Sequence, residues 1–185
     1  MMFRRRALAA ILASGALAAC ATGSESGAGA WTRGPDNRVM VSEPGVLSYS
    51  VMTPSDWTGS ATGARSPARL NAGSGGGQAT AEIGVARTAE SADRLAARLA
   101  ARAGVGDGLG APNRLAPIPL QMGGGRRAEV FSVPRRSGGG AVIVAVISEP
   151  GAHAYQLLDA SNGAAYDRAM PLMRNVVASY RPEGR

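Results

Sequence analysis

The sequence predicts an α/β (α+β) domain, in which an antiparallel sheet carries one helix after its second strand and a C-terminal helix packed on it. Residues 127–133 alternate apolar and polar side chains, and a turn separates them from the continuous apolar run 141–147. This is the pattern of an antiparallel hairpin whose second strand is central and covered on both faces. Residues 92–103 and 164–180 instead place apolar side chains three and four apart, as amphipathic helices do.

The folded domain, 39–185, is expected to begin near Val39 with a strand–loop–strand segment. Residues 46–52 alternate apolar and small side chains and end just before Pro54, which predicts a strand stopped by proline. Residues 80–86 carry Ile83 and Val85 two positions apart, which predicts the second strand.

The helix expected over 92–103 follows Ser91, a residue type that caps helix N-termini, and ends at Gly104. Three arginines lie four residues apart and so share one face of it. We interpret this face as solvated; a contact with an anionic lipid or a partner is the alternative. These arginines are Arg94, Arg98 and Arg102.

Between this helix and the hairpin, residues 104–125 contain three prolines and glycines at both ends, so any strand within them is expected to be short. The glycines at 104, 106, 108 and 110 follow a helix. A dinucleotide-binding loop follows a strand and opens a helix, so no phosphate-binding loop is expected here.

After a further strand at 153–158, the chain closes with the helix expected over 164–180. Pro171 lies inside this helix and is expected to kink it or to restart it. Five side chains share the face that packs on the sheet, at steps of four, three, four and three: Tyr166, Met170, Met173, Val177 and Tyr180.

The first residues have the pattern of an export signal. Arg4 to Arg6 precede the thirteen-residue stretch 7–19, which is apolar except for Ser14 and Gly15. As a helix with a rise of about 1.5 Å per residue it spans roughly 20 Å, less than the ~30 Å hydrocarbon core of a bilayer. The pattern therefore predicts a signal peptide over 1–19 rather than a membrane-spanning helix.

The end of this signal resembles the lipobox of bacterial lipoproteins, with Leu17, Ala18 and Ala19 before Cys20. The resemblance implies signal peptidase recognition of residues 17–19, cleavage before Cys20, and attachment of a diacylglyceryl group to the Cys20 sulfur. Two or three acyl chains anchor a protein stably, because each buried CH₂ contributes about 0.8 kcal/mol. Ala21 follows Cys20, and the family's sorting rule then implies the outer membrane, facing the periplasm; the outer leaflet of the inner membrane is the alternative.

Composition indicates a flexible tether after Cys20 and limits the classes of partner that are expected. Residues 20–38 are mainly glycine, alanine and small polar residues, which predicts a flexible tether; we interpret Trp31 within it as a chance aromatic, with a docking anchor as the alternative. All 20 basic residues are arginine, and without 1–19 there remain 17 of them against 13 acidic residues, a formal net charge of +4. Because no basic run is interleaved with aromatic residues, no nucleic acid is expected as a partner.

No catalytic, metal-binding or cofactor-binding set is predicted. His153 is the one histidine, and Ser148 and Asp159 lie near it in sequence, but no serine has a G-x-S-x-G context. We therefore expect His153 to be structural. A remote carboxylate pair for glycoside cleavage stays open, although the carboxylates that we consider are scattered without metal-ligand spacing: Asp56, Asp93, Asp107, Glu129, Glu149, Asp159 and Asp167.

The order of these elements resembles the PsbP/Mog-like fold, which DcrB-type lipoproteins share, and is similar to a domain that trails some bacterial zinc metalloproteases. The resemblance covers about 39–182 and rests on a strand ending in proline and tryptophan, a Tyr-x-Leu strand, and a Ser-aromatic-Arg tail after the last helix. The chain has no HExxH zinc helix. The residues concerned are Pro54 and Trp57, Tyr155 and Leu157, and Ser179, Tyr180 and Arg181.

The resemblance implies a binding or accessory role, because these families are mostly non-enzymatic. Our first hypothesis is a non-catalytic, lipid-anchored module that binds a protein or another envelope component through one face of its sandwich. The second is a carrier of a lipid or small amphiphile in an apolar cavity between helix and sheet. The third is a hydrolase with an unidentified site, which would depend on His153.

Overall fold

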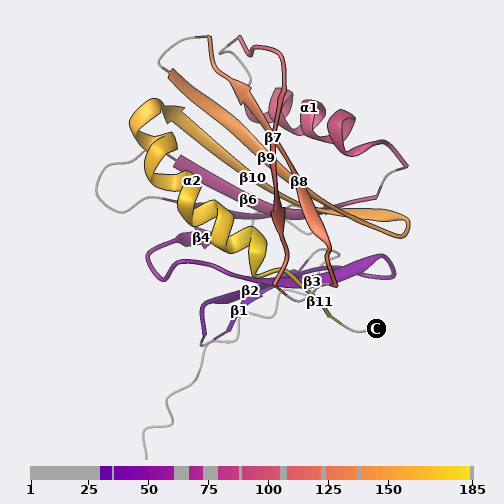
Figure 1. The fold of residues 1–185 in the computed structure, drawn as a ribbon. Helices are drawn as coiled ribbons and strands as arrows, with labels where there is room; N and C mark the ends of the chain where they lie inside the picture. Colours follow the sequence, from indigo (N-terminus) through magenta and orange to yellow (C-terminus); the bar gives the residue numbers. More distant parts are fainter. Residues whose placement is uncertain are drawn as a thin grey trace, which may run out of the picture.

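The computed structural model describes residues 30–34, 36–60, 67–72, 79–87, 89–104, 108–121, 124–136 and 139–183. These residues form two antiparallel sheets and two helices (Figure 1). Cys20 and the residues expected to precede it at the signal peptidase site, 17–19, lie outside the described residues.

The large sheet has the strand order β4-β5-β6-β10-β9-β8-β7, and the small sheet has the order β1-β2-β3-β11. The strands of the large sheet are β4 (Thr58–Ser60), β5 (Ala68–Asn71), β6 (Ala79–Ala86), β7 (Asn113–Pro119), β8 (Arg127–Pro134), β9 (Gly139–Glu149) and β10 (Ala152–Asn162). Those of the small sheet are β1 (Ala30–Arg33), β2 (Arg38–Glu43), β3 (Leu47–Met52) and β11 (Arg181–Glu183).

The large sheet is the middle layer. Helix α1 (Ala92–Ala103) covers one face over β8, β9 and β10, whereas helix α2 (Gly163–Ala178) and the small sheet cover the other (Figure 1). Strands β9 and β10 are therefore buried on both faces: Val144 and Leu157 contribute to the α1 core, and Ile143 and Leu158 to the α2 core. This arrangement confirms the prediction that the apolar run 141–147 forms a central strand.

The mixed α/β architecture and both helices follow the expectations from the sequence. Helix α1 has the expected bounds and ends at Gly104, whose N–H donates to the Ala100 carbonyl. Ser91 occupies the N-cap position, but its side chain makes no capping hydrogen bond, contrary to the expectation. Helix α2 runs through Pro171 as one element and is capped by Asn162, whose side chain accepts from the Ala165 N–H.

Three parts of the architecture differ from the expectations. Strands β2, β4 and β5 lie where no strand was expected, so α1 follows the sixth strand in the chain order instead of the second. The segment expected to be a tether contains β1, so the sheet structure begins at Ala30 rather than near Val39, with Trp31 opposite Val41 in the register. Strand β7 forms within the stretch expected to hold only a short strand, and it lies at the edge of the large sheet. Its prolines are tolerated there because an edge strand has one side without ladder hydrogen bonds.

The residues that carry the family resemblance hold the layers together. The Trp57 side chain is fully buried. Ser179 accepts a hydrogen bond from the Met52 N–H at 2.7 Å, which ties the end of α2 to β3. The Tyr180 ring packs on the Tyr49 ring with centroids 5.2 Å apart, and Arg181 begins the β11 pairing with β3. These roles are structural.

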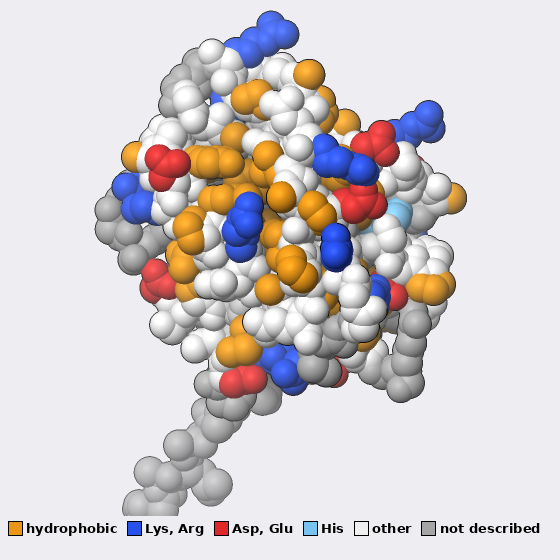
Figure 2. Space-filling view, viewed as in Figure 1, with side chains coloured by type: hydrophobic (Ala, Val, Ile, Leu, Met, Phe, Trp, Pro, Cys, Tyr) orange, Lys and Arg blue, Asp and Glu red, His pale blue; other side chains and the backbone are white. Residues whose placement is uncertain are grey.

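Apolar side chains from α2 and β7 gather on one face of the molecule, with single arginines between them (Figure 2). They are partly buried side chains that pack against the core, among them Leu115, Tyr166 and Leu172. Among the described residues, the large apolar side chains that are well exposed are Met40 and Met52, both on the small sheet.

Among the described residues, Gln156 of β10 is a core residue whose amide has no hydrogen-bond partner on either atom. Its side chain is almost fully buried, and within the described part of the chain neither Oε1 nor Nε2 has a hydrogen-bond partner. It lies between Ile83 of β6 and Ala145 of β9 in the register. An unpaired buried polar group costs about 1–3 kcal/mol.

We therefore predict that Gln156→Leu raises the free energy of unfolding by about 1–2 kcal/mol, because an apolar side chain of similar volume needs no partner in this position. Urea denaturation of the purified protein measures the change. Leu158→Ala, two residues along the same strand and facing the same core, is the matched control and is expected to lower the free energy by about 2–5 kcal/mol. Destabilisation by Gln156→Leu would contradict the prediction.

Candidate functional site

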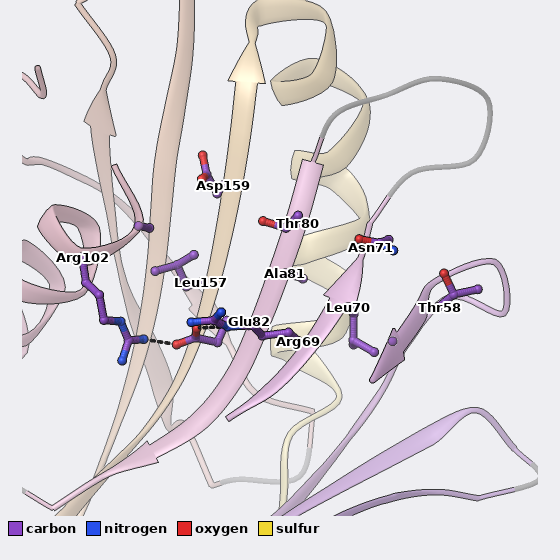
Figure 3. A pocket seen from close by; sticks show the side chains of 12 residues that line it. Thr58, Arg69, Leu70, Asn71, Thr80, Ala81, Glu82, Arg102, Leu157 and Asp159 are labelled. Carbon is purple, nitrogen blue, oxygen red and sulfur yellow. Dashed lines mark hydrogen bonds and ion pairs between the residues drawn. The ribbon is translucent and has the colours of Figure 1, made fainter. Parts of the chain in front are cut away.

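A pocket of about 580 Å³ opens on the α1 side of the large sheet, between the C-terminal end of α1 and the strands β4, β5 and β6 (Figure 3). Its lining combines charged, hydroxyl and amide side chains with a few apolar ones. The lining residues are Thr58, Gly59, Arg69, Leu70, Asn71, Thr80, Ala81, Glu82, Arg102, Ala103, Leu157 and Asp159.

Glu82 of β6 forms the floor of this pocket. Its side chain is 9 % exposed and pairs with Arg69 of β5, whose Nε lies 3.2 Å from Oε2. Arg102 of α1 pairs with the other carboxylate oxygen, Oε1. A buried carboxylate costs several kcal/mol unless such partners compensate it. The charge of Glu82 therefore requires the end of α1 and the strand β5 to lie on either side of it.

A third partner reaches Glu82 across the sheet. The Tyr155 hydroxyl donates to Glu82 Oε1 at 2.9 Å, and it does so by lying over Gly84, its register partner on β6. A Cβ at Gly84 would stand 2.6 Å from this hydroxyl oxygen, closer than van der Waals contact allows. From the other face of the sheet, Tyr49 donates to the Gly84 and Tyr155 carbonyl oxygens.

Burial, hydrogen bonds and neighbouring charges shift the pKa values of Tyr155, Tyr49 and Arg102. Burial raises the pKa of the Tyr155 hydroxyl far above its ordinary value, and the charge of Glu82 raises it further. Burial also raises the pKa of Tyr49. For Arg102, burial lowers the pKa, but hydrogen bonds and charges from Tyr155 and Glu82 outweigh it and the net pKa is raised. Both tyrosines therefore stay protonated donors, and Arg102 stays charged.

The residues considered as a catalytic set do not come together. His153 lies opposite Ser148 in the hairpin register, but Asp159 is six residues further along β10, a distance of about 20 Å at ~3.3 Å per residue. Asp159 pairs with Arg135, and His153 Nε2 lies 2.8 Å from the Glu90 carbonyl oxygen. His153 and Asp159 are therefore far apart, and each contacts a different partner.

The arginine face of α1 divides between two roles. Arg98 pairs with Glu90 on the exposed side of the helix, whereas Arg102 turns to Glu82 in the pocket. Arg94 lines a second depression of about 530 Å³ together with Arg114 and Phe131. The Arg98 and Arg102 side chains are 55 % and 46 % exposed, as expected for a solvated face, but Arg102 also lines the pocket.

Sequence reasoning named Arg102 and Asp159 separately and did not single out Glu82. The available signal was a carboxylate inside the apolar strand segment 79–86, because charged residues are rarely fully buried unless they are paired.

Within the described ranges, no three His, Cys, Asp or Glu side chains gather closely enough to hold a metal ion. Neither α1 nor α2, nor any other helix in the described part of the chain, is long and apolar enough to span a bilayer.

We predict that Gly84→Ala destabilises the protein by about 1–3 kcal/mol, because the added methyl group forces the Tyr155 ring away from Glu82. Thermal unfolding followed by circular dichroism measures this loss. Gly163→Ala is the matched control: its Cβ meets its nearest neighbour, the Gly139 carbonyl oxygen, at an ordinary 3.5 Å, so its stability should stay within about 0.5 kcal/mol of the wild type. Equal effects of the two substitutions would refute this account of Gly84.

Comparisons with known proteins identify the fold. No protein-family model matches the sequence, and no curated protein matches it. Among solved structures, the chain is similar to cyanobacterial PsbP (CyanoP) from Synechocystis sp. PCC 6803, with a TM-score of 0.50 and 12% sequence identity over 80% of this chain and 94% of that one. At this identity the likeness concerns the fold alone. The chain therefore has a PsbP-like fold, as the sequence resemblance implied.

Proposed function

We propose that this chain is a lipid-anchored, non-catalytic accessory lipoprotein of the bacterial envelope, which binds a protein or another envelope component through its PsbP-like domain. The observation that carries the binding role is the polar pocket beside Glu82 within a fold whose family resemblance implies accessory functions. The contacts of His153 with Glu90 and of Asp159 with Arg135 support structural rather than catalytic roles for these two residues.

The anchor in this proposal is Cys20, recognised together with Leu17, Ala18 and Ala19. The membrane is then the first partner, through the acyl chains, and the domain faces the periplasm from the outer membrane. Because β1 begins at Ala30, ten residue steps separate Cys20 from the small sheet. These steps reach at most about 36 Å in any conformation, so the domain stays close to the bilayer surface.

Carriage of a lipid or amphiphile is less well supported. That function calls for an apolar cavity between a helix and the sheet. The space between α2 and the large sheet is instead filled by buried side chains such as Met173 and Val177, and the pocket at the end of α1 is lined by Arg69, Glu82 and Asp159. A polar or charged ligand fits this lining better than an acyl chain.

We predict that Cys20→Ser moves the protein from the membrane fraction of its native host to the soluble fraction, because the serine oxygen is not a substrate for thioether attachment. Density-gradient fractionation locates the wild type, and mass spectrometry of its N-terminal peptide measures the acyl groups. Chemical crosslinking in intact cells should capture a specific envelope component with the wild type that is lost or reduced with the released variant.

Two results would contradict the proposal, and a third would change only the membrane assigned to the protein. One is a wild-type protein that is water-soluble and unacylated. Another is hydrolase activity of the purified protein that His153→Ala abolishes. Recovery in the inner-membrane fraction would overturn only the outer-membrane placement and would favour the outer leaflet of the inner membrane.

A further inference from the structure

We propose that the pocket beside Glu82 binds a polar small molecule by an oxyanion, either a carboxylate or a phosphate, held between Arg69 and Arg102. This inference deepens the binding role proposed above by naming the chemistry of a ligand. It depends on the geometry of three side chains from three elements, β5, β6 and α1, which meet at one end of the pocket (Figure 3).

The three side chains differ in their exposure to solvent. The Glu82 side chain is 9 % exposed, but those of Arg69 and Arg102 are 59 % and 46 % exposed. A ligand entering the pocket therefore contacts the guanidinium groups, while the buried Glu82 carboxylate lies beneath them and pairs with both. The Glu82 carboxylate holds both arginine side chains in place before a ligand arrives. Fewer side-chain conformations are then lost on binding, which reduces the entropic cost of binding.

Both arginines have more N–H donors than Glu82 accepts. Glu82 accepts from Nε of Arg69 and from one terminal nitrogen of Arg102. Each guanidinium carries five N–H donors in a planar fork that matches the oxygens of a carboxylate or phosphate. Both arginines thus keep further donors for a ligand, and these donors come from opposite sides of the same carboxylate.

The charged side chains at this end of the pocket do not cancel. Two arginines against Glu82 leave one positive charge at this end of the pocket, because the other acidic lining residue, Asp159, is paired with Arg135. Arg135 is itself only 7 % exposed and so offers little to a ligand. An anion is therefore favoured beside Arg69 and Arg102, and its attraction is less screened in a concave site than on an open surface.

The far end of the pocket is lined by polar side chains. Asp159 and Thr80 are register partners, and they lie two residues along the strands from the Leu157 and Glu82 pair, a distance of about 7 Å. Asn71, the register partner of Thr80 on β5, lies beside them (Figure 3). These side chains favour a ligand with hydrogen-bond donors about 7 Å from its oxyanion, and the volume of about 580 Å³ admits a molecule larger than phosphate.

Isothermal titration of the full-length protein in detergent tests this inference. The probes are dialanine, which carries a carboxylate and an ammonium group, dialanine amide, which lacks the carboxylate, and inorganic phosphate, which lacks the ammonium group. Dialanine and phosphate should bind saturably. The amide should bind at least about tenfold more weakly than dialanine, because the loss of a charge-assisted hydrogen bond lowers the affinity by about tenfold or more. Dialanine binding without phosphate binding would assign the site to carboxylates, and the reverse result to phosphates.

Arg69→Gln and Arg102→Gln should each weaken binding of the probe that binds by about tenfold or more. Arg98→Gln is the matched control, because Arg98 lies one turn before Arg102 and pairs with Glu90 outside the pocket; its affinity should equal that of the wild type. The inference is wrong if neither dialanine nor phosphate binds at concentrations up to about 10 mM, or if Arg98→Gln weakens binding as much as Arg102→Gln.

The ligand test and the anchor test can fail separately. A membrane-bound, acylated protein without saturable binding overturns the oxyanion site and leaves the lipid anchor standing. A soluble, unacylated protein that binds dialanine through Arg69 and Arg102 overturns the lipid anchor and supports the oxyanion site. Since the amide probe removes the oxyanion from the ligand instead of from the protein, it tests the contact even if an arginine variant unfolds.

Discussion

The burial of one carboxylate constrains much of this molecule. Glu82 lies in the large sheet with its charge out of water, and it remains there because Arg69, Arg102 and Tyr155 all reach it. Each partner comes from a different element, so compensating one charge fixes the end of α1, the strand β5 and the strand β10 relative to β6. The same constraint requires glycine at position 84, because the Tyr155 hydroxyl occupies the space of a side chain there.

The central strands supply the rigid support for this arrangement. Strands β9 and β10 each extend over 11 residues and are buried on both faces, so one face packs against α1 and the other against α2 and the small sheet. Alternation of side chains along a strand places Tyr155 and Leu157 on the α1 side. The pocket forms where α1 ends before the sheet does. A site built on strands and a helix end is held more firmly than one built on loops.

The strongest periodic patterns predicted the elements that they formed. The apolar run 141–147, the leucines of 92–103 and the apolar face of 164–180 each depend on burial, and burial is what hydrophobic periodicity records. Strands β1 and β11 were missed because they join the small sheet through backbone pairing in segments with little apolar alternation. Strand β7 was underestimated because its prolines argue against a central strand but not against an edge strand.

The site was less predictable than the fold. The sequence pattern places Arg102 on a helix face and Asp159 among scattered acidic residues. Nothing local indicates that a tyrosine 73 positions away forms a hydrogen bond with Glu82. That contact depends on β6 and β10 being neighbours, which is a property of the strand order. A sequence shows which charges are present, but their pairing follows from the topology. The lipid anchor, in contrast, is predicted from a local sequence pattern around Cys20 and does not depend on the strand order.

The claim that the Glu82 carboxylate ties α1 to the sheet is tested most directly by a double-mutant cycle. The free energies of unfolding of the wild type, Glu82→Gln, Arg102→Gln and the double variant give the coupling between the two side chains. We predict that the double variant is less destabilised than the sum of the single variants by about 1 kcal/mol or more. Additive effects within about 0.5 kcal/mol would contradict it.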